Sequence, residues 1–128
     1  MDPIADFFIR IKNGYRAKKP AVLIPFSQLK AEITRVLEAR GYIGAIEKKG
    51  RKVRKFLEIG LLYPDGAPAL GGVRLISKPS RRIYLKRNEI RPVRQGHGLL
   101  VISTSRGVMS GEDARKAGVG GVAIAEVW

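Results

Sequence analysis

Apolar residues recur at helical spacing in two segments of the N-terminal half. Residues 2–14 and residues 28–40 both place apolar side chains three and four positions apart, which predicts two amphipathic helices. Gly14 is expected to end the first of them. A third, short helix is predicted over residues 110–118, where a serine and an aspartate three positions later have the spacing of a capping box.

Elsewhere the apolar residues alternate or form short runs, which predicts strands. The predicted strands cover residues 21–24, 42–47, 56–62, 73–77, 82–85, 99–103 and 122–128. Residues 48–55 carry six basic residues and a glycine, and we expect them to form the turn of a hairpin. The fold class that follows is α+β, with two small tandem subdomains. The expected division is an N-terminal αβαββ part at 1–65, a linker rich in Ala, Pro and Gly at 66–72, and a mostly β part with one short helix at 73–128.

The stretch VISTSRGVM joins the end of an apolar strand to a polar loop. Ser103, Thr104 and Ser105 offer hydroxyl groups that both donate and accept hydrogen bonds. Arg106 can bind a phosphate or stack on a base, and Gly107 permits a close backbone approach or a positive φ. Two interpretations stay open. The loop contacts a polar ligand with an anionic backbone, or it is an ordinary strand-to-helix turn whose hydroxyls bond local backbone groups.

The charge of the chain favours the first interpretation. Lys and Arg number 25 against 11 Asp and Glu, a net charge of +14, so a polyanionic partner is expected. No apolar run approaches the ~20 residues of a membrane span, and no basic helix has an aromatic-rich face, which argues against a membrane. Neither longer helix resembles a DNA recognition helix, and an irregular hydroxyl-rich loop suits a shaped RNA better than a major groove.

The sequence offers little for catalysis. His97 is the single histidine and lies between two glycines, there is no cysteine, and the acidic residues are scattered. A catalytic triad, a zinc site and a phosphate-binding loop therefore all lack their required residues. We expect no enzyme, no cofactor and no metal.

Three segments carry a resemblance that covers essentially the whole chain: DPIADFFIRIKNGYRAKK, SKPSRRIYLK and ISTSRGVMSGEDARKAGVGG. Together they resemble the bacterial-type small-subunit ribosomal protein number eight, the universal small-subunit eight family. The resemblance implies a structural constituent of the small ribosomal subunit that binds an irregular helix in the central domain of 16S-type rRNA and supports assembly. Neighbouring small-subunit ribosomal proteins are further implied partners. The alternative is a free regulatory RNA-binding protein that represses its own operon mRNA.

The same resemblance, together with charge, assigns expected contacts. Base and sugar contacts are expected at Ser103, Thr104, Ser105, Gly107, Tyr84, Gly120 and Gly121. Phosphate contacts are expected at Arg10, Lys12, Asn13, Lys30, Arg81, Arg82, Lys86 and Arg106. Two alternatives stay open: the polar residues late in the first helix complement its dipole, and Tyr84 is a half-buried strand tyrosine.

Two positions depart from the family pattern. Val122 follows the GG pair where the family usually has Glu, and a valine cannot accept the hydrogen bonds of a carboxylate. Ser80 follows Pro79 where the family usually has Gly, so this turn must form without glycine's freedom at positive φ. The start of the chain shows no signal-peptide pattern. The expected location is the cytoplasm, in the small ribosomal subunit, with an organellar matrix or stroma left open.

Overall fold

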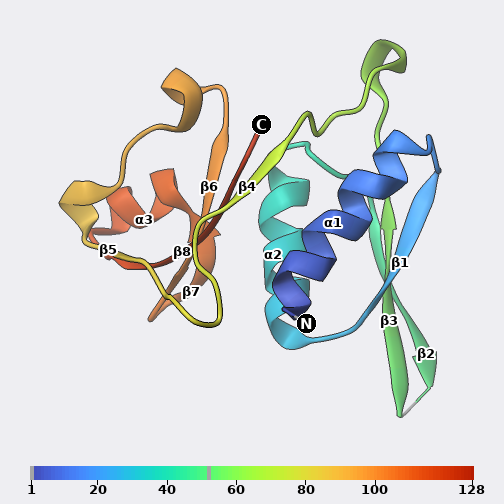
Figure 1. The fold of residues 1–128 in the computed structure, drawn as a ribbon, viewed down its shortest axis with the longest axis horizontal. Coiled ribbons are helices and arrows are strands. Elements are labelled where there is room, and N and C mark those ends of the chain that lie inside the picture. Colours follow the sequence, from blue (N-terminus) through green and yellow to red (C-terminus); the bar gives the residue numbers. More distant parts are fainter. Residues whose placement is uncertain (1, 52) are drawn as a thin grey trace. The chain divides into compact units, whose positions relative to one another are not determined.

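The computed structural model describes residues 2–51 and 53–128, which form two compact units, Pro3–Gly71 and Gly72–Trp128. In these described residues the chain contains three α-helices and two antiparallel sheets (Figure 1). The predicted α+β class is therefore confirmed. Among the described residues, no helix is both long enough and apolar enough to cross a bilayer.

The N-terminal unit packs two helices against a three-stranded sheet of order β1-β3-β2. Its elements are α1 (Pro3–Arg16), β1 (Ala21–Pro25), α2 (Gln28–Ala39), β2 (Ile46–Arg51) and β3 (Arg54–Gly60). The buried side chains of both helices are mostly those that the apolar spacing indicated, for example Phe7, Ile11 and Ile33. At the start of α2, the Ser27 hydroxyl accepts a hydrogen bond from the Lys30 amide at 3.1 Å, as an N-cap residue does.

The predicted end of the first helix at Gly14 is wrong. Gly14 lies inside α1 and is buried, and a Cβ there would lie 2.4 Å from Val22 Cγ1 on β1. Glycine is needed for this close approach between helix and strand. One residue later, the Tyr15 hydroxyl donates to the Tyr42 carbonyl at 2.6 Å and accepts from the Leu62 amide at 3.2 Å. Burial raises the pKa of this phenol.

The hairpin of this unit is longer than predicted. The strand expected at 42–47 instead covers Ile46–Arg51, and β3 begins at Arg54, so most of the expected 48–55 turn is paired strand. Backbone hydrogen bonds continue through the charged residues because strand pairing does not require apolar side chains. The part of the predicted turn at Lys52 lies outside the described residues. In Figure 1 the ends of β2 and β3 extend beyond α1 and α2.

The C-terminal unit is built on a sheet of order β4-β8-β6-β7, with β5 also pairing β8. Its elements are β4 (Val73–Leu75), β5 (Tyr84–Leu85), β6 (Leu99–Thr104), β7 (Gly107–Ser110), α3 (Gly111–Ala117) and β8 (Gly121–Val127). The predicted short helix is present: the Ser110 hydroxyl accepts from the Asp113 amide at 3.0 Å, and Gly118 follows its end with φ 71°.

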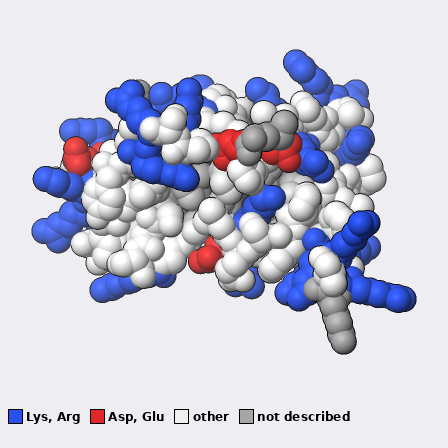
Figure 2. All heavy atoms as spheres, turned by 60° about the horizontal axis from the view of Figure 1, so that its bottom comes forward, with Lys and Arg blue, Asp and Glu red and all other residues white. Residues whose placement is uncertain are grey.

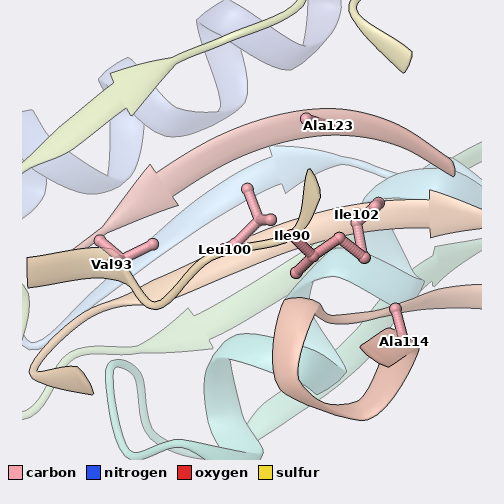
Figure 3. Packing of buried hydrophobic residues seen from close by; sticks show 6 residues of the cluster. All are labelled: Ile90, Val93, Leu100, Ile102, Ala114 and Ala123. Carbon is pink, nitrogen blue, oxygen red and sulfur yellow. The ribbon is translucent and has the colours of Figure 1, made fainter. Parts of the chain in front are cut away.

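One face of this sheet forms the core of the unit. Ile102 and Ala123 are completely buried there beside Ala114 of α3, and Leu100, Ile90 and Val93 complete the cluster (Figure 3). Side chains alternate between the two faces of a strand. Ser103, which follows Ile102 on β6, and Val122, which precedes Ala123 on β8, therefore point to the other face of the sheet.

Candidate nucleic-acid interface

A row of four side chains crosses the sheet of the C-terminal unit on the face opposite the core. Tyr84 of β5 is aligned with Val122 of β8, Val122 with Ser103 of β6, and Ser103 with Val108 of β7. Residues aligned in this way share one face of an antiparallel sheet. Tyr84 is 63% exposed, and the other three are half-buried. We call these four residues the Tyr84 row.

The hydroxyl-rich stretch forms a tight β-hairpin, so β6 does not lead directly into the helix as the strand-to-helix alternative expected. Thr104 and Gly107 are paired, and the exposed Ser105 and Arg106 form a two-residue turn between them. The Thr104 hydroxyl donates to the Gly107 carbonyl at 2.8 Å and accepts from the Arg106 amide at 3.0 Å. Gly107 has φ 110°, a conformation that favours glycine. Thr104 therefore shapes the turn, while Ser105 and Arg106 are presented at its tip.

The two glycines at the start of β8, Gly120 just before it and Gly121 as its first residue, let three strands meet. A Cβ at Gly120 would lie 2.3 Å from the Leu85 carbonyl oxygen, and one at Gly121 would lie 2.1 Å from the Ser103 carbonyl oxygen. Gly121 is aligned with both Leu85 and Thr104. Because Gly121 is buried, it offers no surface for the base or sugar contact expected of it. Its place in the sheet sets the spacing of β5, β8 and β6, and with it the Tyr84 row.

The basic residues of this unit are presented by short turns beside the sheet. Lys78 and Arg81 exchange backbone hydrogen bonds of 2.9 and 3.0 Å around Pro79 and Ser80. The non-glycine residues with positive φ in the described chain do not include Ser80, so this turn forms without the freedom of glycine. Buried Ser77 anchors the loop: its hydroxyl donates to the Ala123 carbonyl and accepts from the Ile83 amide.

The predicted cations of the C-terminal unit stay exposed. Arg81 and Arg82 precede β5, and Lys86 follows it. The alignment of Leu85, Gly121 and Thr104 places Lys86 and the turn carrying Arg106 at the same end of the sheet. Figure 2 shows Lys and Arg side chains mainly around the margin of the face in view, with Asp and Glu confined to a few patches. This end of the sheet combines exposed cations with the hydroxyl of Ser105, which suits an anionic polar polymer.

In the N-terminal unit, three predicted phosphate-binding residues share the last turns of α1. Arg10, Lys12 and Asn13 are exposed, and the Arg10 guanidinium pairs with Asp6 at 2.9 Å. Arg10 and Asn13 line a shallow groove of about 330 Å³ against β1, together with Lys19. Lys19 was missed by the motif reasoning, although it belongs to the basic turn that follows this helix. The groove therefore brings two cations and the Asn13 amide together, as the end of the C-terminal sheet brings cations together with the Ser105 hydroxyl.

The structure does not support the phosphate contact predicted at Lys30. This lysine is only 7% exposed, and its ammonium group donates to the Pro25 carbonyl at 3.4 Å. It therefore fastens the start of α2 to the end of β1. The sequence prediction also missed Val108 as a member of the Tyr84 row, because strand β7 was not predicted. The one indication in the sequence was an apolar residue two positions before the Ser110 cap.

Comparisons with known proteins give a consistent result over the whole chain. A family model described as Ribosomal protein S8 matches residues 2–128. The small ribosomal subunit protein uS8 of Novosphingobium aromaticivorans is 42% identical over 127 residues, which cover 99% of this chain and 97% of that protein. Proteins of the same name from Mycoplasmopsis agalactiae and Dictyoglomus thermophilum are 42% and 40% identical over the same shares.

Proposed function

Because the chain belongs to the ribosomal protein S8 family, we propose that it binds an irregular helix in the central domain of 16S-type rRNA and supports assembly of the small ribosomal subunit. The Tyr84 row, with exposed Lys86 and Arg106 at one end of its sheet, is the observation that supports this most. Membership of this family indicates a structural protein rather than an enzyme. Neighbouring small-subunit ribosomal proteins would be its other partners.

Affinity and discrimination come from different residues in this proposal. Exposed cations of both units, such as Arg10, Arg82 and Lys86, attract the phosphate backbone without regard to sequence. The Tyr84 ring can stack on an unpaired base, and the Ser103 hydroxyl can donate to or accept from a base or sugar. An irregular helix exposes such groups, whereas a regular A-form duplex hides its base edges in a deep, narrow groove.

The experiment that tests this function compares two RNAs at the same salt concentration. One is an rRNA central-domain fragment with an irregular internal loop, and the other is a regular duplex of equal length. We expect the purified chain to prefer the irregular fragment by a hundredfold or more, about 2.7 kcal/mol. Equal binding to both RNAs would mean that the net charge of +14 accounts for the affinity, and it would refute site-specific rRNA binding.

A further inference from the structure

The N-terminal unit has an open sheet face whose chemistry the proposed function does not use. Strand alignment places Lys49 beside Phe56, and Arg51 beside Arg54, on one face of the hairpin. Leu23 of β1 belongs to the same face, since it is aligned with Glu58. The opposite face carries Ile24, Leu57 and Ile59, which are buried. Phe56 is 37% exposed and Leu23 54% exposed, so aromatic, apolar and cationic side chains share a solvent-facing strip.

The charges along this strip are not balanced. The Lys49 ammonium lies 3.0 Å from a Glu58 carboxylate oxygen and 3.7 Å from one of Glu47. The positive charge of Lys49 is therefore balanced by anions within the strip. Arg51 and Arg54 are directly opposite each other. Within the described part of the chain, neither makes an ion pair.

Two like charges directly opposite each other destabilise a strand pair. A phosphate placed between Arg51 and Arg54 would remove this repulsion, because a guanidinium group forms forked, charge-assisted hydrogen bonds with phosphate oxygens. Phe56 lies two residues from Arg54 on the same face, about 7 Å away by strand geometry. That separation is within the span of one nucleotide, so base stacking and phosphate contact can occur together.

We propose that Phe56, Arg51 and Arg54 form a second RNA contact, which takes an unpaired nucleotide with its base on the Phe56 ring and its phosphate between the two arginines. An exposed aromatic side chain interleaved with cations on a sheet face is the pattern that binds single strands. A regular duplex keeps its bases stacked and cannot use the ring. The ligand class rests on the proposed rRNA function, whereas the residues belong to the other unit of the chain.

The test uses the full chain and a short oligouridylate as the probe. The variant R51Q/R54Q removes two positive charges and is expected to weaken binding by about tenfold or more, because hydrogen bonds to charged groups are the strong ones. The matched control R91Q/R115Q removes the same charge from exposed positions of the C-terminal unit and is expected to change binding by less than about twofold. An equal loss in both variants would overturn the proposal.

The stacking contact has its own readout. Phe56→Trp keeps an aromatic ring at this position, and its fluorescence, in excess of the Trp128 signal of the unsubstituted chain, should be quenched by oligouridylate and not by a regular duplex. Phe56→Ala should weaken oligouridylate binding by about fivefold or more, since stacking on aromatic side chains contributes strongly per base. No added quenching in the tryptophan variant would refute base stacking at this position. Displacement of the RNA by polyglutamate at equal charge concentration would likewise overturn it, in favour of an acidic protein ligand.

Failure of this contact is distinguishable from failure of the proposed function. The preference of the unsubstituted chain for the irregular rRNA fragment reports on the Tyr84 row. Oligouridylate binding by R51Q/R54Q reports on the hairpin of the N-terminal unit. A chain that keeps the fragment preference but shows no effect of R51Q/R54Q refutes the second contact alone.

Discussion

Ser103 and Thr104 are adjacent hydroxyl residues with different environments, and replacing each should separate RNA recognition from folding. The Thr104 hydroxyl makes two hydrogen bonds inside the β6–β7 turn, to the Gly107 carbonyl and from the Arg106 amide. In the described part of the chain, the Ser103 hydroxyl makes no hydrogen bond, and its side chain is on the face of the Tyr84 row. Thr104→Val should therefore act mainly on the protein, and Ser103→Ala mainly on the complex.

The magnitudes follow from these contacts. Each lost turn bond contributes about 1 kcal/mol net, so Thr104→Val should lower the free energy of unfolding by about 1–2 kcal/mol. Ser103→Ala should change it by less than about 0.5 kcal/mol, as at surface positions without special contacts. In the complex, loss of one hydrogen bond from Ser103 should weaken binding to the irregular fragment by about 0.5–1.5 kcal/mol, roughly a two- to twelvefold rise in Kd. Binding to the regular duplex should not change.

Urea denaturation followed by Trp128 fluorescence measures the first effect. Trp128 reports on the C-terminal unit because its backbone bonds with Gly72 at 3.0 and 3.1 Å and its ring lies 3.9 Å from the Arg94 guanidinium carbon. Titration with the two RNAs measures the second effect. An equal loss on both RNAs for Ser103→Ala would refute its role in discrimination, and an unchanged unfolding midpoint for Thr104→Val would refute its role in the turn.

Three further substitutions test other parts of the structure. Gly121→Ala places a Cβ 2.1 Å from the Ser103 carbonyl oxygen, so the backbone must shift. Urea denaturation should show that the free energy of unfolding falls by more than about 2 kcal/mol, and the preference for the irregular RNA fragment should be lost. Wild-type values would contradict the role of this close approach. Arg10→Ala removes an exposed ion pair with Asp6, so the free energy of unfolding should change by less than about 1 kcal/mol. Binding to both RNAs should weaken, and the negative slope of log K against log salt should become less steep by roughly 0.7–0.9. An unchanged slope argues against phosphate contact. Burial raises the pKa of Tyr15 above the ordinary value of 10.0, so folding favours the neutral phenol. Its contribution to stability is complete below pH 10.0 and is lost as the pH rises through the higher pKa of the folded state. Denaturation at several pH values should therefore show a shallower decline of stability above pH 10.0 for Tyr15→Phe than for the unsubstituted chain.

Local patterns in the sequence were enough to predict the helices and their starts. Ser27 and Ser110 cap α2 and α3 as expected, because capping depends on residues within one turn of each other. Strand β7 escaped prediction because its hairpin turn is Ser105-Arg106, which lacks the Asn-Gly or Asp-Gly signal of two-residue hairpins. Once that strand was missed, a loop leading into α3 was the natural interpretation.

Contacts between distant segments could not be predicted from local patterns. The charge of Lys30 indicated an exposed residue, but its burial depends on the Pro25 carbonyl at the end of β1. The glycines at 120 and 121 were recognised as a pair, yet their reason, the approach of the Leu85 and Ser103 carbonyl oxygens, appears only when β5 and β6 are placed on either side of β8. The cationic pair Arg51 and Arg54 likewise depends on the register of the hairpin.

In the proposed complex, we expect the Tyr84 row to discriminate between RNAs through the cost of a wrong ligand as much as through the gain from a right one. Ser103 lies between Val122 and Val108 on the sheet, and neither valine side chain can accept or donate a hydrogen bond. An RNA that seats on this row and excludes water must therefore satisfy the Ser103 hydroxyl itself. An RNA without a matching group leaves that hydroxyl buried and unpaired, which costs about 1–3 kcal/mol, more than the net gain from one good hydrogen bond. A carboxylate at position 122 would supply a neighbouring acceptor and relieve this cost, so Val122 makes the row more demanding of its ligand than a glutamate would.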